Sequence, residues 1–425
     1  MEEIKQLSII AESQPHAAYS ALTNGLVGRW TFLMRVVSGI REMLQPLEDA
    51  IRLYLLPAIT GRAALSDAER RVLALPVRDG GLGIPIPTTS AANQLESSTF
   101  ITQPLVNLLP LQHNADTVVS NLHTTQLRLK KETSKHHREK QQEEAIALRQ
   151  TLPASLRKSL ELASEKGASA WLTTLLLEEH GFSLHKQAFR DALCVRYGWE
   201  PTRLPSHCMC GAQFTTTHAF SCAKGAFPSI RHDRIRDMTA QLLSEVCPNV
   251  EVEPPLQPLT GETFRHRTAN VEDNTRLDVK AQGFWGSNRQ CAYFDVRVFN
   301  PHAPTNCNQT IAASYRRHEN EKRREYEKRV VEVEHGSFTP IVMSSTGGWG
   351  PSAMIMYKRL ASLIATKHAA PYSATMRMIR CKIAFSLIDS MAMCLRGARS
   401  SSHKPMKALD LIDTPVDLVV NEGRF

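Results

Sequence analysis

The stretch CAYFDVRVF, residues 291–299, decides the fold of the second half of this chain. Successive side chains of a strand point to opposite faces, so one face of this stretch is apolar and consists of Ala292, Phe294, Val296 and Val298. The opposite face carries Asp295 and Arg297. The run RLDVKA, residues 276–281, has the same pattern, with Asp278 and Lys280 on its polar face. Both runs therefore predict strands that each present one aspartate and one cation from the same side.

Sequence order favours pairing between these two strands, which would bring Asp278 and Asp295 together. Two carboxylates on one sheet face are costly to hold together unless a cation neutralises them. Mg²⁺ takes oxygen ligands of this kind, and it can activate water and stabilise a phosphate under attack. The alternative interpretation is a strand with one solvated face, where apolar and polar residues also alternate.

The elements around these strands can be predicted as well. An amphipathic helix over 228–247 has an apolar stripe, with Arg231 and Glu245 near the edge of the stripe at opposite ends. A short strand, VEVEPPL (250–256), and a polar excursion, LTGETFRHRTANVEDNT (259–275), come next. A charged helix is predicted over 309–330, with Lys322 on the face that can point toward the sheet. A strand, FTPIVMSS (338–345), and helices at about 352–367 and 373–396 follow, with Gly397 as a C-cap.

A cluster of cysteine and histidine precedes the first of these helices, in CMCGAQFTTTHAFSC (208–222). Its candidate ligands are Cys208, Cys210, His218 and Cys222, while the adjacent His207 is interpreted as a spectator. Four such ligands within fifteen residues suit a tetrahedral Zn²⁺ site, and a site closed by four protein ligands is structural. The alternative is an exposed loop with free thiols.

Composition indicates an ordinary globular protein with a formal net charge of +9, which suits a polyanionic partner. The nine cysteines are odd in number and mostly scattered, which favours a reducing compartment. No signal peptide or membrane-spanning run is apparent, so we expect a soluble intracellular protein without a membrane partner.

The first half of the chain reads as helices, including a capping box formed by Ser66 and Glu69. The charged residues 128–149 predict an exposed helix. We interpret this helix as a solvated spacer in a linker region, the alternative being a specific contact surface.

The order of helix, three strands, helix and strand, taken with these motifs, resembles the PD-(D/E)xK nuclease fold. More narrowly, it resembles the restriction-like endonuclease at the C-terminus of site-specific non-LTR retrotransposon polyproteins. The resemblance spans roughly residues 185–345. The features that carry it are the zinc cluster, Arg231-His232-Asp233, Asp278, Asp295-Val296-Arg297 and the helix from Lys322 to Tyr326.

This resemblance implies an endonuclease that hydrolyses phosphodiester bonds with Mg²⁺ or Mn²⁺. Asp278 and Asp295 would bind the metal, with Glu245 as a possible further acid and Arg297 or Lys322 steadying the phosphate. Contacts to nucleic acid are assigned to Arg231, His232, Lys322, Arg323 and Arg324.

The chain departs from the family pattern at two positions. Leu277, not proline, precedes the first aspartate, and Arg297 stands where the family has a lysine. Arginine is too basic to shuttle protons, although it can stabilise charge in a transition state. Lys280 or Lys322 would then supply the missing lysine.

The N-terminal segment, including GRAALSDAERRVLALPVRDGGLGIP (61–85), resembles the region that follows the reverse-transcriptase palm in related elements. The Tyr/Phe-x-Asp-Asp polymerase motif is absent from the chain, so no polymerase activity is expected. The predicted divisions are 1–125 (helical), 126–184 (linker), 185–228 (zinc knuckle), 229–345 (nuclease core), 346–400 (C-terminal helices) and 401–425 (tail).

The sequence and the resemblance thus predict an α+β protein derived from a retrotransposon. Its second half would be an endonuclease that nicks DNA, and it would be located in the nucleus. Its partners would be DNA and element RNA. The main alternative is an inactive nucleic-acid-binding protein from the same source. A purely structural scaffold would leave the paired aspartates and cations on the two strands unexplained.

Overall fold

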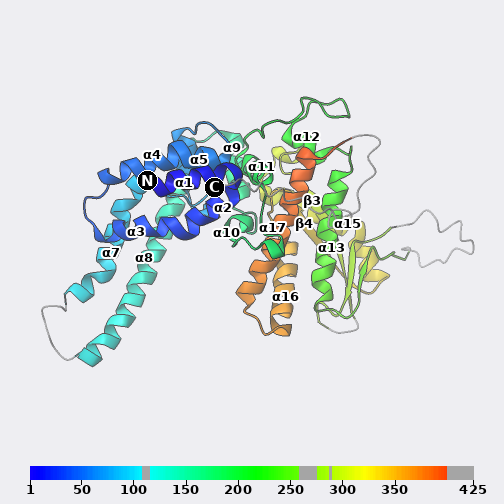
Figure 1. Ribbon diagram of the computed structural model, residues 1–425. Coiled ribbons are helices and arrows are strands. Elements are labelled where there is room, and N and C mark those ends of the chain that lie inside the picture. Colours follow the sequence, from blue (N-terminus) through cyan, green and yellow to red (C-terminus); the bar gives the residue numbers. More distant parts are fainter. Residues whose placement is uncertain (108–114, 258–274, 287–289, 400–425) are drawn as a thin grey trace, which may run out of the picture. The chain divides into compact units, whose positions relative to one another are not determined.

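The computed structural model describes residues 1–107, 115–257, 275–286 and 290–399 (Figure 1). The chain divides into two compact units. Unit 1 consists of Met1–Thr202, Thr346–Trp349 and Pro371–Ile388, and unit 2 consists of Arg203–Ser345, Gly350–Ala370 and the chain from Asp389 onward. The predicted tail, 401–425, and nearly all of the polar excursion at 259–275 lie outside the described residues. No helix among the described residues is long and apolar enough to cross a membrane.

Unit 1 is helical, as the sequence predicts for this part of the chain. Its helices are α1 (Glu2–Ser13), α2 (Pro15–Ala21), α3 (Val27–Val36), α4 (Gln45–Ala50), α5 (Leu56–Thr60), α6 (Asp67–Ala74), α7 (Pro87–Val106), α8 (Ala115–Thr151), α9 (Ala154–Ala163), α10 (Ala170–Thr173) and α11 (Lys186–Tyr197). Short turns of π- or 3-10 helix connect several of these, at Leu22–Leu26, Glu42–Leu44, Ile51–Leu55, Val77–Asp79 and Glu178–His180. The predicted capping box is confirmed, because the Ser66 side chain accepts from the Glu69 backbone N–H and the Glu69 carboxylate accepts from that of Ser66.

The core of unit 1 includes a buried histidine. The His16 ring stacks on Phe189 with ring centroids 4.8 Å apart, and Trp171 lies edge-on to it. The His16 Nδ1 accepts from the Leu184 backbone N–H, which leaves Nε2 to donate to the Trp171 carbonyl. Desolvation by burial lowers the pKa of His16 to about 4. This packing therefore requires the neutral imidazole.

The predicted linker at 126–184 is wrong as a domain boundary, because this region packs within unit 1. Ala145 and Leu148 on α8 are buried, and Arg149 donates to the carbonyl of Asp79 and the hydroxyl of Ser164. The boundary falls instead after Thr202, since α11 buries one side against α2, α5 and α9. Because most residues of α8 are charged or polar, its few buried apolar residues are hard to recognise from the sequence.

Unit 2 contains a four-stranded sheet in the order β1 (Val250–Val252), β2 (Val279–Gln282), β3 (Cys291–Phe299), β4 (Ser337–Ser344). The first two pairings are antiparallel, and β3 and β4 are parallel. A parallel pair needs a crossover connection, which here contains α14 (Pro304–Cys307) and α15 (Ile311–Glu332). The predicted strand at 276–281 begins later than expected, so Asp278 precedes β2 directly.

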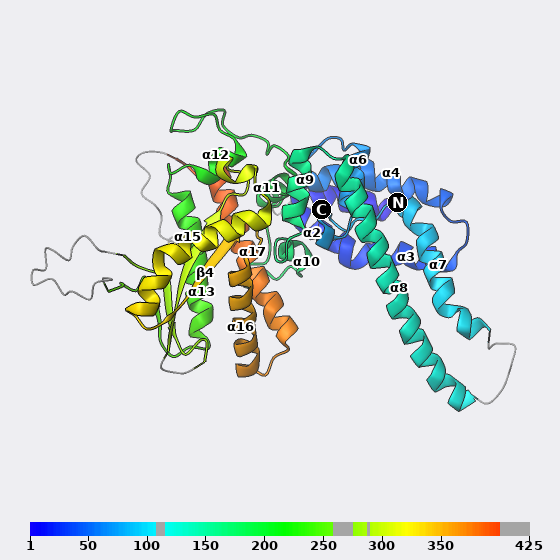
Figure 2. The same ribbon diagram turned by 180° about the vertical axis from the view of Figure 1, so that it is seen from behind.

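Helices cover both faces of this sheet. α15 packs on the face of Tyr293 and Phe299, where Tyr326, Val330 and Tyr315 complete the apolar contacts. The other layer includes α13 (Phe227–Ser244) and α16 (Pro351–Lys367), which share a buried hydrogen bond between Thr239 and Tyr357. α13 lies in front of the sheet in Figure 1 and α15 in front of it in Figure 2. Asp295 is therefore buried, and the alternative of a solvated strand face is wrong for β3.

Two further helices complete the fold. α12 (Thr216–Ser221) belongs to the cysteine and histidine cluster, and α17 (Tyr372–Arg396) contributes residues to both units. α17 ends directly before Gly397, as predicted. The described part of the chain is thus mixed α+β and mostly helical, with a small mixed sheet.

Candidate functional site

The predicted metal ligands Cys208, Cys210, His218 and Cys222 come together in unit 2. Their ligand atoms all lie within 4.8 Å of one another. Cys210 Sγ lies 3.4 Å from His218 Nε2, and Cys208 Sγ lies 3.7 Å from Cys222 Sγ. Three thiols and one imidazole at such distances suit a tetrahedral ion, so this cluster could hold a metal such as zinc.

Local structure explains how this cluster forms. A tight turn follows Cys208, whose N–H bonds the carbonyl of Ala212 and whose carbonyl accepts from Gly211. The Thr215 side chain caps α12 by accepting from the backbone N–H of His218, which lies in the helix's first turn. Backbone N–H groups, that of Ala212 first, lower the pKa of the Cys210 thiol, whereas burial raises that of Cys222. His207 is exposed and lies outside the cluster, as predicted.

The paired aspartates meet at the junction of β2 and β3. Val279 is the register partner of Phe294, so Asp278 and Asp295 occupy the next position along each strand. They are close enough that the charge of Asp278 contributes to raising the pKa of Asp295. Among the described residues, only the Cys208 cluster brings together three or more groups of metal-ligating type at such short distances. The two aspartates therefore do not belong to a compact group of this kind, although the His232 ring lies beside Asp278.

Asp278 is held by two hydrogen bonds to the same oxygen. Its Oδ2 accepts from the backbone N–H of Val296 at 2.6 Å and lies 3.0 Å from His232 Nε2. The His232 Nδ1 faces Asp233 at 3.2 Å. Burial would lower the pKa of His232, but hydrogen bonds and charge from Asp278 and Asp233 raise it to about 9. His232 therefore donates to both carboxylates, and Oδ1 of Asp278 is left free of these bonds.

Asp295 forms the most buried ion pair of the site. Its side chain is 6% exposed, and Lys322 Nζ on α15 lies 3.0 Å from its Oδ2. Desolvation raises the pKa of Asp295 to about 6, although the charge of Lys322 opposes this shift. The contact is an ion pair, since Oδ2 accepts no well-aligned hydrogen bond from the described residues. Lys322 also lies over the Tyr326 ring, 5.1 Å from its centroid.

Arg297 is half-exposed on the same strand and pairs with Glu321 at 3.7 Å. The sequence suggests Glu321 as an ion-pair partner of the basic residues on its helix but does not place it at the site; it also contacts Arg317 and His318. Its position directly before Lys322 on the predicted helix could have indicated that it lies near the site. Lys280, the other candidate for the missing lysine, pairs instead with Glu251 on β1 at 3.4 Å.

The structure does not bring Glu245 into the site. Glu245 follows α13, thirteen residues after His232, which is roughly 20 Å along a helix axis. Its carboxylate faces His368 at 3.5 Å. The prediction of Glu245 as a further acid of the site is therefore wrong, because it lies at the opposite end of the helix.

The prediction that Arg231 contacts nucleic acid is also wrong. Arg231 is 4% exposed, and its guanidinium donates to the carbonyls of Phe220 and Val298 at 3.4 Å. Burial lowers the pKa of this guanidinium. It tethers the knuckle region and β3 to α13, so no phosphate can reach it. The predicted position of Arg231 at the edge of the apolar stripe could have indicated that its side chain points inward.

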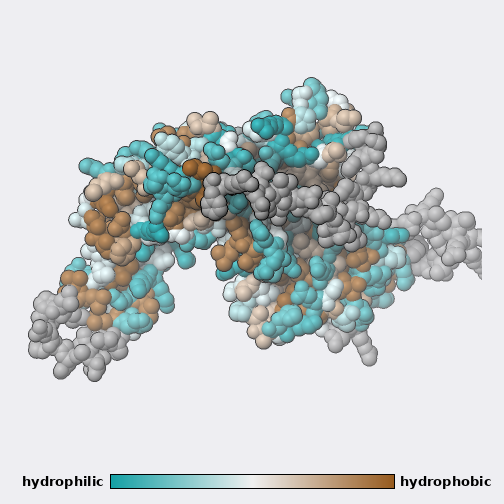
Figure 3. All heavy atoms as spheres, in the orientation of Figure 1, coloured by the Kyte–Doolittle hydropathy of each residue, from teal (hydrophilic) through white to brown (hydrophobic). Residues whose placement is uncertain are grey.

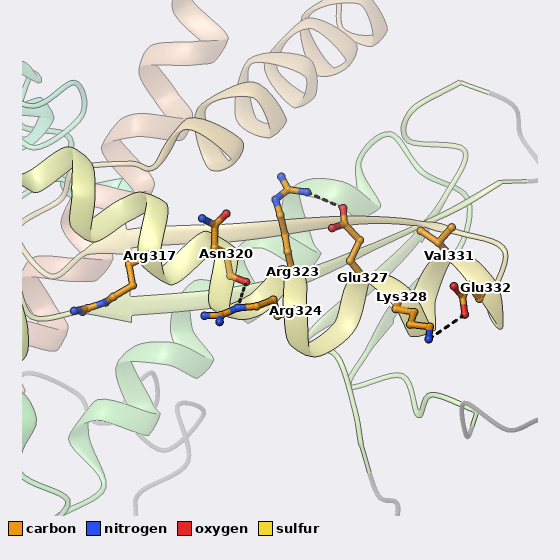
Figure 4. Close-up of a pocket in the computed structure, with 8 residues that line it drawn as sticks. All are labelled: Arg317, Asn320, Arg323, Arg324, Glu327, Lys328, Val331 and Glu332. Carbon is orange, nitrogen blue, oxygen red and sulfur yellow. Dashed lines mark hydrogen bonds and ion pairs between the residues drawn. The ribbon is translucent and has the colours of Figure 1, made fainter.

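The basic residues of α15 differ in their availability. Arg323 is held by Glu327 at 2.9 Å and by the Ser352 hydroxyl, whereas Arg324 is exposed and donates to the Asn320 carbonyl of its own helix. Figure 4 shows these side chains along a groove of about 800 Å³ that also includes Arg317 and Lys328. This side of α15 is open and basic, while Lys322 points inward to Asp295.

Comparison with known proteins adds no identification. No protein-family model matches this chain, and no curated protein sequence matches it.

Proposed function

We propose that unit 2 is a metal-dependent endonuclease that nicks DNA, with the zinc cluster as a structural element. The observation that carries this proposal is the group formed by buried Asp295 and the partly buried Asp278 and Lys322. Two carboxylates and one lysine converge there from two strands and the helix that covers them. Removing three charges from water is costly, and a carboxyl group such as that of Asp295, whose pKa is raised mainly by burial, is typical of functional sites.

The donor set fits a small divalent cation. Both hydrogen bonds of Asp278 use Oδ2, which leaves Oδ1 for a metal, and Asp295 offers a carboxylate with unmet hydrogen-bonding capacity. Mg²⁺ is commonly bound by one or two carboxylates plus substrate phosphate, so a third protein ligand is not required. When bound, Mg²⁺ or Mn²⁺ would supply an activated water and Lewis acidity at the phosphate.

The residues of the chain would then have distinct roles. His232 fixes the carboxylate of Asp278, and Asp295 binds the metal. Lys322 neutralises Asp295 while no substrate is present and stabilises the developing negative charge of the phosphate during attack. It thus supplies the lysine that position 297 lacks. Arg297, half-exposed beside this group, contacts the phosphate from the open side.

The Cys208 cluster would bind one structural Zn²⁺, and Arg324 on the open side of α15 would contact the DNA backbone. Element RNA would be a second ligand of these basic surfaces. Such a protein, resembling the endonuclease of non-LTR retrotransposons, would work in the nucleus.

A supercoiled plasmid incubated with purified protein tests this function. Conversion to the open circle should require Mg²⁺ or Mn²⁺ and stop with a chelator of these ions. The competing function is a binding protein without catalysis, which is favoured by Arg297 at the lysine position. Binding without metal-dependent cleavage of plasmid, nicked or flapped DNA would establish that alternative.

A further inference from the structure

A second cationic surface lies in unit 1, between α7 and α8. These helices pack against each other, and a groove of about 640 Å³ follows one side of their seam. Two stripes at helical spacing face it, from Gln94 to Thr102 on α7 and from Lys130 to Gln141 on α8. Among the described residues that line this groove, four are arginine or lysine and none is aspartate or glutamate. Figure 1 shows the two helices side by side.

The four cations of this groove are Arg35, Arg78, Lys130 and Arg138, all of them exposed. Arg35 bonds the Gln94 amide and Arg78 bonds the Gln141 amide, while Arg78 also pairs with Asp79 at 3.4 Å. Lys130 and Arg138 form no ion pair with any residue that the structure describes. Their positive charge is therefore available to a ligand.

Hydroxyl groups add donors between these cations. Ser98, Thr102 and Ser134 line the groove, and the hydroxyl of Thr133 is buried without a hydrogen-bond partner among the described residues. The other side of the same seam differs, since its smaller groove of about 320 Å³ includes Glu96 and Glu132. The two grooves therefore differ in charge, since carboxylates line the smaller groove and none lines the larger one among the described residues. Figure 3 shows hydrophilic surface along α8.

We propose that this groove binds the phosphodiester backbone of a nucleic acid. Lys130 and Arg138 are eight residues apart, which is about 12 Å along the helix. Phosphates of one strand follow each other at 3.4 Å of duplex axis, so the groove spans several phosphates. Arginine, lysine and hydroxyl side chains are the usual donors to phosphate oxygens. The surface lies in a different unit from the proposed nuclease site, so it goes beyond that function.

The test compares two double variants of the full chain by fluorescence anisotropy with labelled DNA and RNA duplexes. Lys130→Ala with Arg138→Ala removes the two free cations of the groove. Lys131→Ala with Lys135→Ala removes the same charge from exposed positions of α8 that do not line it. Circular dichroism and zinc content establish that both variants are folded.

We expect the groove variant to bind more weakly and its salt dependence to be shallower. Each phosphate contact contributes about 0.9 to the slope of log K against log salt concentration. Two lost contacts therefore make the loss of affinity about tenfold greater at 50 mM than at 200 mM salt. The DNA and RNA arms identify which nucleic acid the groove prefers.

Equal weakening by both double variants would mean that only net charge matters, and it would overturn the proposal. Unchanged binding in the groove variant would overturn it as well. If the groove variant loses binding to vesicles with anionic lipid but keeps binding to nucleic acid, the groove is a membrane site instead. These results do not affect plasmid nicking, so the proposed nuclease function is tested separately.

Discussion

The ammonium group of Lys322 lies 3.0 Å from Oδ2 of Asp295, and both side chains are largely buried. Lys322 lies on α15, which belongs to the crossover that follows β3, and Asp295 lies on β3 itself. Lysine at a buried carboxylate can serve in the chemistry at a phosphate, whereas the guanidinium of Arg297 cannot exchange protons at ordinary pH. Under the proposed function, Lys322 would take the role of the lysine that the resembled nucleases have at the position of Arg297.

Replacing the two candidate lysines separately identifies which one acts. Lys322→Met should abolish nicking, because it removes the cation beside Asp295 while keeping the length of the side chain. Lys280→Met is the matched control, since Lys280 pairs with Glu251 on β1. Plasmid relaxation should be lost only in the first variant. The opposite pattern would assign the role to Lys280 and contradict the account of the site.

Arg297→Lys restores the residue that the resembled family has at this position. Because Arg297 is half-exposed and its pairing with Glu321 is 3.7 Å long, the shorter cation can be accommodated without unfolding. We expect nicking to be kept or increased, measured as the initial rate of plasmid relaxation. A loss of tenfold or more would mean that the planar guanidinium itself is required.

The Cys208 cluster should hold one zinc ion per chain. Cys210→Ser should lose this zinc and lower the melting temperature, because binding energy at a structural site contributes to folding. Cys307→Ser is the control, since Cys307 is exposed and lies outside the cluster. Metal analysis of the purified proteins measures the outcome. Zinc retained by Cys210→Ser would remove Cys210 from the ligand set.

His16 should make unit 1 sensitive to acid. Its pKa falls from 6.5 in the unfolded chain to about 4 in the folded one, so the unfolded state binds the extra proton first. The contribution of neutral His16 to the free energy of unfolding is fully present above pH 6.5 and is lost as the pH falls to about 4. A shift of this size corresponds to about 3 kcal/mol.

His16→Gln removes the titrating group and tests this prediction. Urea unfolding followed between pH 7 and pH 4 should show a shallower decline of stability for the variant than for the wild type. Parallel curves would contradict the assignment of this acid sensitivity to His16.

The sequence pattern predicted the elements of unit 2 well. β3 matches its predicted range, and α15, β4, α16 and α17 lie within three residues of theirs. These segments combine clear periodicity with turn residues at their ends, so local physics is enough to define them. The cysteine cluster was also predictable, because its ligands lie close together in the chain.

Arg231 and Glu245 show where prediction from sequence failed. Periodicity placed both residues at the edge of an apolar stripe, but it could not tell which edge is covered by other elements. Contacts with Phe220, Val298 and His368 decide this, and they involve distant parts of the chain. The partition of α8 and α11 into unit 1 depended in the same way on long-range packing.

Nicking of supercoiled plasmid by Asp295→Asn, compared with the wild type in Mg²⁺ and in Mn²⁺, tests the central claim most directly. The amide keeps the size of the side chain and removes one charge from the metal site. The wild type should form open circles only with added metal. The variant should lose at least a hundredfold in rate while binding the same DNA as tightly or more tightly, because repulsion from phosphate decreases. Equal nicking by both proteins, or none by the wild type, would contradict the claim.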